Sequence, residues 1–334
     1  MDWIQSLLIP LVYSTVLVVI LLTGFAYLSY VERKLVARFT MRFGPNRAGP
    51  FGLLQPLADA LKMMFKEELM PTHADKWVYL LAPLLAISTA VISWAVFPFA
   101  SRGFAVAGYT VSPFIADVNV GLLFVAAVTS IGAYAVVLAG WSSDNKYSLL
   151  GALRASAQLV SYELPLGLTL VAVILVTGTM SMTKIIQFQV DHAWLIVLQP
   201  IAFIIFFIAG LAESNRSPFD LPETENELVS GYITEYGGIR FAAFFMGEYI
   251  HVITFSALTS ILFLGGWSGP GADSIPLLGL LYFLIKIAVM IFMVIWVRTA
   301  VPRVRYDQLM RFCWKFLMPL ALLNLVVTAI VIAL

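Results

Sequence analysis

Residues 213–235 read ESNRSPFDLPETENELVSGYITE and lie between two apolar segments, each long enough to cross a bilayer. The stretch carries one base, Arg216, and six of the nineteen acidic residues of the chain: Glu213, Asp220, Glu223, Glu225, Glu227 and Glu235. Like charges this close to a membrane repel one another. The stretch therefore requires an explanation in solvation, structural pairing or proton chemistry.

The composition is that of a polytopic membrane protein. The 334 residues are 61% hydrophobic and 12% charged, whereas a soluble domain is about 45–50% apolar and about 25% charged. The net charge of +1 argues against a nucleic-acid partner. Cys313 is the one cysteine, so neither an internal disulfide nor a thiolate-held iron–sulfur cluster is expected. The three histidines are too far apart in sequence to suggest a metal site.

Hydrophobic runs set the expected architecture. A helix needs roughly 20 apolar residues to cross a hydrocarbon core of about 30 Å. The first run lacks the features of a signal peptide and is expected to be retained. The sequence predicts an all-α polytopic membrane protein, one membrane domain over 1–334, with about eight transmembrane helices. The expected spans lie near 7–30, 77–98, 118–140, 160–180, 194–212, 239–263, 277–297 and 313–333.

The positions of Lys and Arg predict the orientation. Nearly all of them fall in loops on one side of the expected membrane. The other side has Arg102 and Lys184, and Lys286 falls within a span. Because cytoplasmic loops carry the excess of basic residues, both termini are expected outside. The acidic loop, 213–238, is then expected on the cytoplasmic or matrix side.

An amphipathic helix is expected over residues 51–68, in the long loop after the first span. Its apolar residues recur at helical spacing: Leu54, Leu57, Ala58, Leu61, Met64 and Phe65. The helix is too short and too charged to span, so we expect it at the membrane surface on the cytoplasmic side. One interpretation is a simple anchor. The other is one lip of a lateral opening for a lipid-soluble ligand.

Several charged residues are predicted within or at the ends of spans, where ionisable groups cost at least about 2.5–3.5 kcal/mol. Glu163, Glu213 and Glu248 are carboxylates of this kind, and His251 follows Glu248 on the same helical face. One interpretation is structural ion pairing, with Glu248–Lys286 as the obvious pair. The other is proton transfer along a row of carboxylates that titrate as a coupled group.

The acids of the loop add a second feature. In an extended segment Glu223, Glu225 and Glu227 would share one face, and Pro222 favours such a segment. They are therefore expected to point together into one cavity or partner surface. From the residues alone, a secondary transporter and a subunit of a redox pump both remain open.

Long motifs narrow this choice. They read YVERKLVARFTMRFGPNRAGPFGLLQPLADALK at 30–62, GWSSDNKYSLLGALRASAQLVSYELPLG at 140–167, LAESNRSPFDLPETENELVSGYITEYGG at 211–238, FFMGEY at 244–249 and WVRTAVPRVRYDQLMRFCWK at 296–315. Together they closely resemble the H-subunit family of respiratory complex I, the proton-pumping NADH:quinone oxidoreductase (type I NADH dehydrogenase). The resemblance covers essentially the whole chain.

This resemblance implies a subunit between the electron-carrying arm and the membrane arm, inactive alone. Quinone, the substrate, would enter from the bilayer between the first span, the amphipathic helix and the sixth span. The resemblance implies a quinone tunnel lined by Glu32, Arg33, Arg42, Asp59 and Arg298. It implies a proton path through Glu163, Glu213, Glu223, Glu225, Glu227 and Glu248.

The resemblance also implies where the chemistry resides. NADH, FMN and iron–sulfur clusters would be bound by partner subunits, and no cofactor by this chain. Its partners would be quinone-site subunits of the hydrophilic arm, small membrane subunits and the lipid bilayer, without nucleic acid. The expected location is a bacterial cell (inner) membrane, or a mitochondrial or thylakoid membrane in a eukaryote. The type of quinone, ubiquinone or another, stays open.

Three alternatives remain at this point. One is the homologous membrane subunit of a proton-pumping hydrogenase or F420H2 dehydrogenase. Another is a free-standing proton-coupled transporter, which would need a substrate site between repeated halves, and no repeat is visible. The third is a purely structural anchor, which the intramembrane acids argue against.

Overall fold

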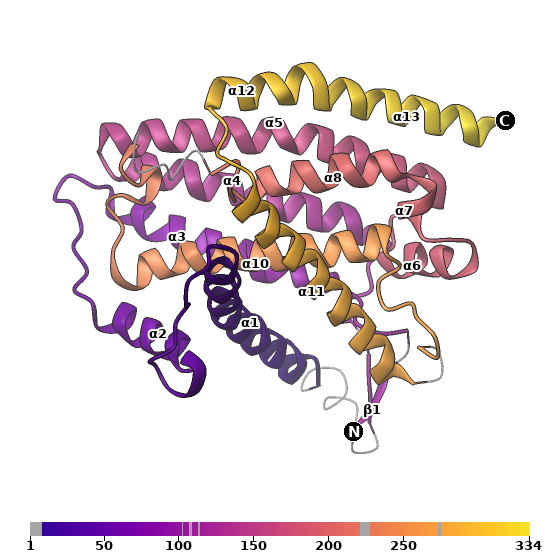
Figure 1. Ribbon diagram of the computed structural model, residues 1–334, viewed down its shortest axis with the longest axis horizontal. Helices are drawn as coiled ribbons and strands as arrows, with labels where there is room; N and C mark the ends of the chain where they lie inside the picture. The colour runs from indigo at the N-terminus through magenta and orange to yellow at the C-terminus, as the bar shows by residue number, and fades with distance from the viewer. Residues whose placement is uncertain (1–8, 102, 107–108, 113, 221–227, 273–274) are drawn as a thin grey trace.

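Long apolar helices form most of the protein. The computed structural model describes residues 9–101, 103–106, 109–112, 114–220, 228–272 and 275–334 (Figure 1). In these ranges seven helices are long and apolar enough to cross a membrane, and a further apolar helix is shorter. The chain is therefore an all-α polytopic membrane protein. The described part adds one antiparallel hairpin of β1 (Phe104–Val106) and β2 (Tyr109–Val111).

The membrane helices occur throughout the chain. They are α1 (Ile9–Phe39), α3 (Lys76–Ile92), α4 (Gly121–Ser142), α5 (Lys146–Thr177), α8 (Pro200–Glu213), α10 (Gly238–Phe263), α11 (Pro276–Ala300) and α13 (Met318–Ala333). A 3-10 turn, Ser93–Val96, extends α3. A π-helical turn, Cys313–Leu317, joins α12 (Tyr306–Phe312) to α13 and makes one long helix of the two.

Local sequence explains several of the helix ends. Asp75 accepts a hydrogen bond from the backbone N–H of Trp77 at 3.3 Å and begins α3. Asn145 does the same for Tyr147 at 3.0 Å and begins α5. Such side chains satisfy backbone donors that a helix start leaves unpaired. Gly178 ends α5 in the left-handed conformation that glycine adopts without strain.

The segment expected as the fifth span is broken. It consists of α7 (Leu195–Leu198) and α8, with Gln199 between them. Pro200 lacks a backbone N–H and favours the start of a helix over its interior, so the break falls before it. Gln199 turns toward α13, where its Nε2 donates to the Thr328 hydroxyl at 3.0 Å.

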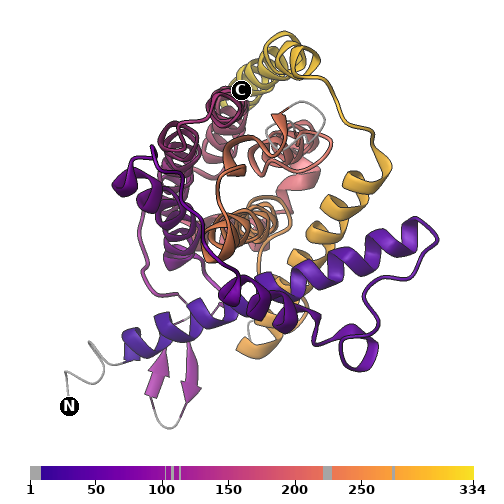
Figure 2. The same ribbon diagram turned by 90° about the vertical axis from the view of Figure 1, so that its left-hand side faces the viewer.

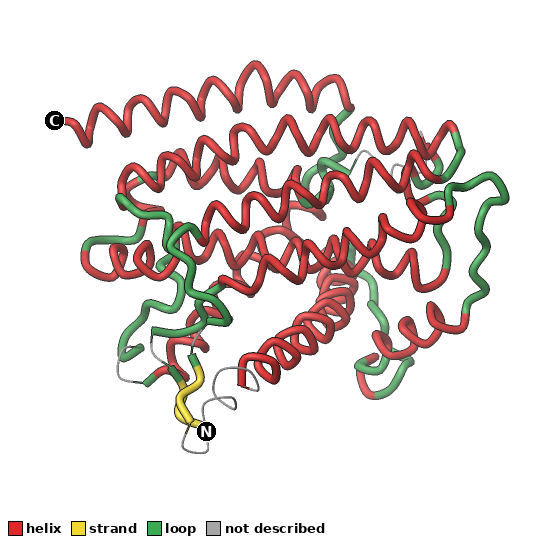
Figure 3. Tube along the Cα trace, turned by 180° about the vertical axis from the view of Figure 1, so that it is seen from behind, coloured by secondary structure: helices red, strands yellow, loops and turns green. Residues whose placement is uncertain are grey.

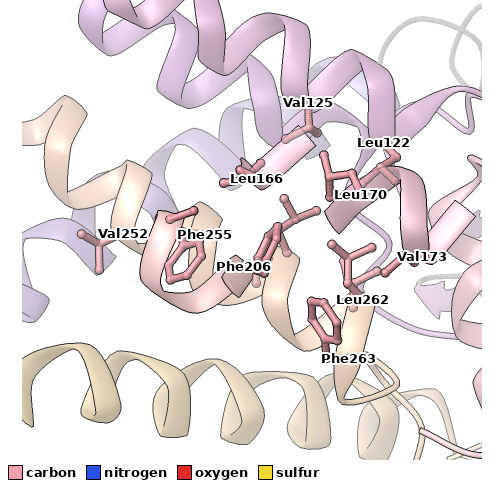
Figure 4. Close-up of a cluster of buried hydrophobic side chains, with 14 of the residues drawn as sticks. Leu122, Val125, Leu166, Leu170, Val173, Phe206, Val252, Phe255, Leu262 and Phe263 are labelled. Atoms are coloured by element: carbon pink, nitrogen blue, oxygen red, sulfur yellow. The ribbon is translucent and has the colours of Figure 1, made fainter. Parts of the chain in front are cut away.

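A bundle of five helices forms the centre of the molecule. The helices α3, α4, α5, α8 and α10 pack against one another, and α13 covers α5. In Figure 1, α5, α8 and α13 lie nearly parallel, while α1 and α11 cross them at a steep angle. Figure 4 shows the apolar core between these helices, with side chains from α4, α5, α8 and α10. The most buried of them include Leu122, Val173, Phe206, Leu262 and Phe263.

The loops that carry most of the basic residues meet at one end of this bundle. The backbone N–H of Asp75 donates to the carbonyl oxygen of Ser142 at 3.3 Å. This bond joins the long loop to the end of α4. The backbone N–H of Val304 donates to the carbonyl oxygen of Pro218 at 3.2 Å. This bond joins the segment after α11 to the acidic loop. This shared end agrees with the predicted orientation, in which these loops lie on the same side of the membrane.

The amphipathic helix is shorter than expected. The helix α2 runs over Gln55–Phe65 rather than 51–68, after a separate 3-10 turn at Pro50–Gly52. Gly52 adopts φ 82°, and this left-handed residue separates the turn from α2. The apolar face of α2 is open, with Leu57 58% and Phe65 84% exposed, as expected for a helix at a membrane surface. Figures 2 and 3 show α2 beside the bundle rather than within it.

Candidate functional site

Three carboxylates from three helices line one internal cavity, called the acidic cavity below. Glu163 comes from α5, Glu213 is the last residue of α8, and Glu248 lies in α10. The cavity measures about 70 Å³. A single water needs about 10–15 Å³, so there is room for a few waters among the carboxylates. The structure thus brings together three of the six residues expected on the proton path.

Two of these carboxylates have neutral hydrogen-bond partners. The hydroxyl of Ser130, on α4, donates to Glu163. The hydroxyl of Tyr232 donates to Oε1 of Glu248 at 3.1 Å. A buried carboxylate without such partners would be costly. The acidic cavity therefore satisfies these acids with hydroxyl groups, which accommodate either protonation state.

A close approach of two glycines positions Tyr232. A Cβ on Gly151 of α5 would lie 2.6 Å from the Cα of Gly231. The hydroxyl of Ser148 donates to the carbonyl of Gly231 at 3.1 Å. The turn at Gly231–Ile233 therefore packs directly against α5, and its central residue, Tyr232, is buried. The second half of the acidic loop is thus part of the packed core.

Glu235, the last acid of the loop, is held by hydrogen bonds to neighbouring helices. Asn145 donates from Nδ2 to Oε1 of Glu235 at 2.6 Å, and the hydroxyl of Tyr79 donates to its carbonyl at 2.7 Å. Tyr236 stacks on Tyr79 with ring centroids 4.1 Å apart. Burial raises the pKa of Tyr236 above its ordinary value. Glu235 therefore anchors the loop and does not line the acidic cavity.

A second, smaller cavity adjoins the acidic one and measures about 40 Å³. Thr129, Glu213, Ser214 and His251 line both cavities. His251 is the functional candidate that the predicted proton path left out. Its spacing from Glu248, three residues on one helical face, was the sequence signal for it.

Four of the five residues expected in the quinone tunnel line another cavity, called the polar chamber below. They are Glu32, Arg33, Arg42 and Arg298, and the aromatic rings of Phe245 and Tyr249 complete the wall. The chamber measures about 470 Å³. Arg298 forms an ion pair with Glu32. Cations, one anion and aromatic faces would suit the carbonyl oxygens and ring of a quinone.

The fifth expected tunnel residue, Asp59, does not line the polar chamber. Its Oδ2 pairs with Nη1 of Arg33 at 2.7 Å, and its Oδ1 accepts from Gln55 at 2.9 Å. Asp59 thus connects α2 to the end of α1. It orients one of the cations of the chamber.

An apolar groove runs between α1 and α11 and measures about 510 Å³. Its walls are almost wholly hydrocarbon and aromatic, for example Leu21, Phe283 and Ile287. Leu28 also contributes to its wall, one helical turn before Glu32 on α1. The groove therefore approaches the polar chamber along α1.

A thin wall separates the polar chamber from the acidic cavity. On α10 the neighbours Glu248 and Tyr249 face the acidic cavity and the chamber respectively. The guanidinium of Arg216 lies over the Tyr249 ring, 4.0 Å from its centroid, and Nη1 is 3.6 Å from Oε1 of Glu32. Ser214, two residues before Arg216, lines the acidic cavity. Arg216 therefore lies in this wall, where it pairs with Glu32 of the polar chamber.

The expected Glu248–Lys286 pair is wrong. Lys286 donates from Nζ to the carbonyls of Gly266 and Ser268, each at 2.8 Å, and lies 4.9 Å from the ring centroid of Trp194. Lys286 is thus held by the loop after α10, and that loop lies at the other end of the bundle from the acidic loop (Figure 1). The structural alternative for Glu248 therefore loses its proposed partner.

Glu223, Glu225 and Glu227 lie outside the described residues, so their expected common face stays a prediction. Within the described ranges no three His, Cys, Asp or Glu side chains form a group that could hold a metal ion. What the described site offers is a row of carboxylates, hydroxyls and one imidazole beside a chamber lined by cations. Such a site can move protons and respond to charge in the chamber.

Comparisons with known proteins agree with the motifs. The profile of a family described as NADH dehydrogenase matches residues 12–329. The H subunit of the NADH-quinone oxidoreductase of Protochlamydia amoebophila is 51% identical over 307 residues, which is 92% of each chain. An H subunit of the same enzyme from Geobacter sulfurreducens is 50% identical over 330 residues, covering 96% of this chain and 93% of its own. The NADH-quinone oxidoreductase subunit 8 of Thermus thermophilus is 49% identical and covers 96% of this chain and 86% of its own.

Proposed function

Because this chain belongs to the NADH dehydrogenase family and is a membrane subunit of NADH-quinone oxidoreductase, we propose that it carries quinone to the electron-carrying arm and couples quinone reduction to proton transport. The oxidoreductase activity belongs to the assembled complex. NADH, FMN and the iron–sulfur clusters belong to partner subunits in this proposal. This chain supplies the route for the quinone and the groups that move protons.

The quinone route begins at the apolar groove. An isoprenoid tail matches the hydrocarbon walls between α1 and α11, and α2 lies in the interface beside them. The polar headgroup then moves along α1 into the polar chamber. There Arg33, Arg42 and Arg298 can donate hydrogen bonds to its carbonyl oxygens, and Tyr249 offers an aromatic face.

Reduction changes charge at this end of the route. Two electrons from a partner cluster and two protons convert the quinone into quinol. Until both protons arrive, extra negative charge attracts the cations of the chamber. Arg298 and Arg216 share Glu32, so a shift of either guanidinium alters the field on the other side of the wall.

The acidic cavity is the proposed receiver of this signal. Glu163, Glu213 and Glu248 share one small space, so their protonation is coupled. A changed field redistributes protons among them and starts transfer toward the neighbouring membrane subunits. Glu223, Glu225 and Glu227 complete the proposed path. The position of Arg216 between the two spaces, paired with Glu32 and stacked on Tyr249, is the observation that most supports this coupling.

The proposed orientation follows the basic loops. Both termini lie outside a bacterial cell membrane, and the end with the acidic loop faces the cytoplasm. The hydrophilic-arm subunits dock on that end, where the polar chamber also opens. Small membrane subunits cover the bundle beside the acidic cavity, and lipid covers the exposed apolar faces.

Glu163→Gln and Glu213→Gln in the assembled complex test this function. Each change keeps the shape of the side chain and removes its proton exchange. Reconstituted in vesicles, both variants should lose most of their NADH-driven proton transport. Glu67→Gln, in the exposed segment after α2, is the matched control and should transport normally. Normal transport in both cavity variants contradicts the proposal.

A further inference from the structure

We infer that His251 passes protons between the acidic cavity and the smaller cavity beside it. This inference rests on the proposed function, because it extends the acidic path by one residue and one compartment. The path would then continue within this chain, away from the end that carries the acidic loop.

The position of the imidazole carries the inference. His251 lines both cavities, as do Thr129, Glu213 and Ser214. Of these four, Glu213 and His251 are the acid–base groups, and the other two are hydroxyls. In the described part of the chain neither ring nitrogen of His251 has a hydrogen-bond partner. The ring is therefore available to waters in the two cavities.

The surroundings of the ring contain no cation among the described residues that line the two cavities. The hydroxyl of Thr89 on α3 and Nε2 of His251 lie on the same side of Gly132 of α4, since a Cβ there would be 3.5 Å from each. The titratable groups that face the two cavities besides His251 are Glu163 from α5, Glu213 from α8, Glu248 from α10 and Tyr232 from the loop. An imidazole among carboxylates can accept a proton from one side without an opposing positive charge.

The second cavity can hold waters that accept the proton from His251. It extends along α10 from His251 to Leu258, which is about 10 Å at 1.5 Å per residue. Its 40 Å³ would admit two or three waters, by the requirement of about 10–15 Å³ for each. Thr254, Thr129 and Ser214 supply hydroxyls along its wall. Apart from these hydroxyls, Glu213 and His251, its wall is apolar.

The transfer step balances. One ring nitrogen takes a proton from a carboxyl of the acidic cavity through a water, and the other nitrogen releases its own proton to a water in the second cavity. The carboxyl becomes a carboxylate, and the imidazole returns to neutrality as the other tautomer. Rotation of the ring resets it for the next proton. No oxidant or further reactant is required.

His251→Gln and His251→Glu in the assembled complex test the inference. Glutamine keeps hydrogen bonding and removes proton exchange, whereas glutamate keeps proton exchange. Proton transport by the glutamine variant should fall at least about tenfold, since a positioned proton-transfer group contributes about 10²–10⁴-fold. The glutamate variant should retain a clearly larger rate. His192→Gln, on the exposed His192 at the end of α6 (Met182–Asp191), is the matched control and should transport normally.

Two results overturn the inference. One is normal transport by the glutamine variant. The other is equal loss in the glutamine and glutamate variants when native electrophoresis shows full assembly, because that result assigns His251 to packing. Should the glutamine variant fail to assemble, Ala126→Val decides the question, since it narrows the second cavity without changing His251. Loss of transport in this variant supports the inference, and normal transport contradicts it.

Glu213→Gln measured in parallel separates this inference from the function on which it rests. If Glu213→Gln loses transport and His251→Gln does not, the acidic path stands and the His251 step is wrong. If Glu213→Gln and Glu163→Gln also transport normally, the proposed function itself is wrong.

Discussion

Nη1 of Arg216 lies 3.6 Å from Oε1 of Glu32, and each of these two residues is only 7% exposed. A cation at the start of the acidic loop is thus paired with the anion of the polar chamber. Glu32 also pairs with Arg298, so one carboxylate faces two guanidinium groups. This arrangement joins the two halves of the site.

Removing that carboxylate should destabilise the protein. Glu32→Gln removes the carboxylate that the buried Arg216 and the partly exposed Arg298 share, and breaking a buried pair costs about 3–5 kcal/mol. Asp307→Asn is the control, because Asp307 is 55% exposed in its pair with Arg305 and such pairs contribute about 0–1 kcal/mol. Chemical unfolding of the purified complex, followed by proteolysis of this subunit, measures both. Equal stability of the two variants would show that Glu32 does not compensate the charges of Arg216 and Arg298.

The hydroxyl of Tyr232 should matter for proton transport. Tyr232→Phe removes the donor to Glu248 and leaves the packing of the ring against Phe244. The lost hydrogen bond is worth about 1 kcal/mol, so assembly should survive while transport slows several-fold. Tyr282→Phe removes a similar hydroxyl, bonded to Pro270 at 3.1 Å at the other end of the bundle. Transport in Tyr282→Phe should be normal, and an equal effect in both variants would argue against a role for the Tyr232–Glu248 bond.

Two glycines of α5 should respond oppositely to alanine. At Gly151 a Cβ would lie 2.6 Å from the backbone of Gly231, so Gly151→Ala must push the turn before Tyr232 away. Overpacking of this kind costs about 1–3 kcal/mol. At Gly167 nothing lies within 4 Å, and alanine there should stabilise the helix by about 0.5–1 kcal/mol. Proton transport and thermal stability of the assembled variants measure the difference, and a harmless Gly151→Ala contradicts the close approach.

Much of the fold follows from local sequence, as the expected positions of α4, α10 and α11 illustrate. Each is a long apolar run with few charges, and such a run has one stable form in lipid. The carboxylates Glu163, Glu213 and Glu248 were also predictable as a set. An ionisable group within a span is so costly in lipid that it must face polar groups or a polar cavity inside the bundle.

The partners of these groups were less predictable, because they depend on how helices tilt and pack. Under the structural interpretation Lys286 was the obvious partner of Glu248, but it donates instead to the carbonyls of Gly266 and Ser268. Similarly, nothing in the sequence near Arg216 indicates Glu32, which comes from α1. The break before Pro200, inside the expected fifth span, and the helix α6, between two expected spans, were also not predicted. Each reflects tertiary contacts that hydropathy does not record.

Lys286 should hold the loop after α10. Lys286→Met removes both bonds to the carbonyls of Gly266 and Ser268, so the amide hydrogens of 264–272 should exchange faster by about tenfold or more, since each bond contributes about 1 kcal/mol. Lys184→Met, on the exposed face of α6, is the control and should leave these amides unchanged. Hydrogen exchange followed by mass spectrometry gives the answer. Unchanged exchange in Lys286→Met would mean that the loop is held by other contacts.

The central claim is that quinone reduction on one side of the Arg216 wall changes protonation on the other side. Infrared difference spectra of the assembled complex, recorded as bound quinone is reduced, measure this directly. We predict a carboxyl signal that appears on reduction, disappears in Glu213→Gln and weakens in Arg216→Lys. Spectra in which reduction leaves every carboxyl signal unchanged, or in which both variants match the unsubstituted complex, would contradict it.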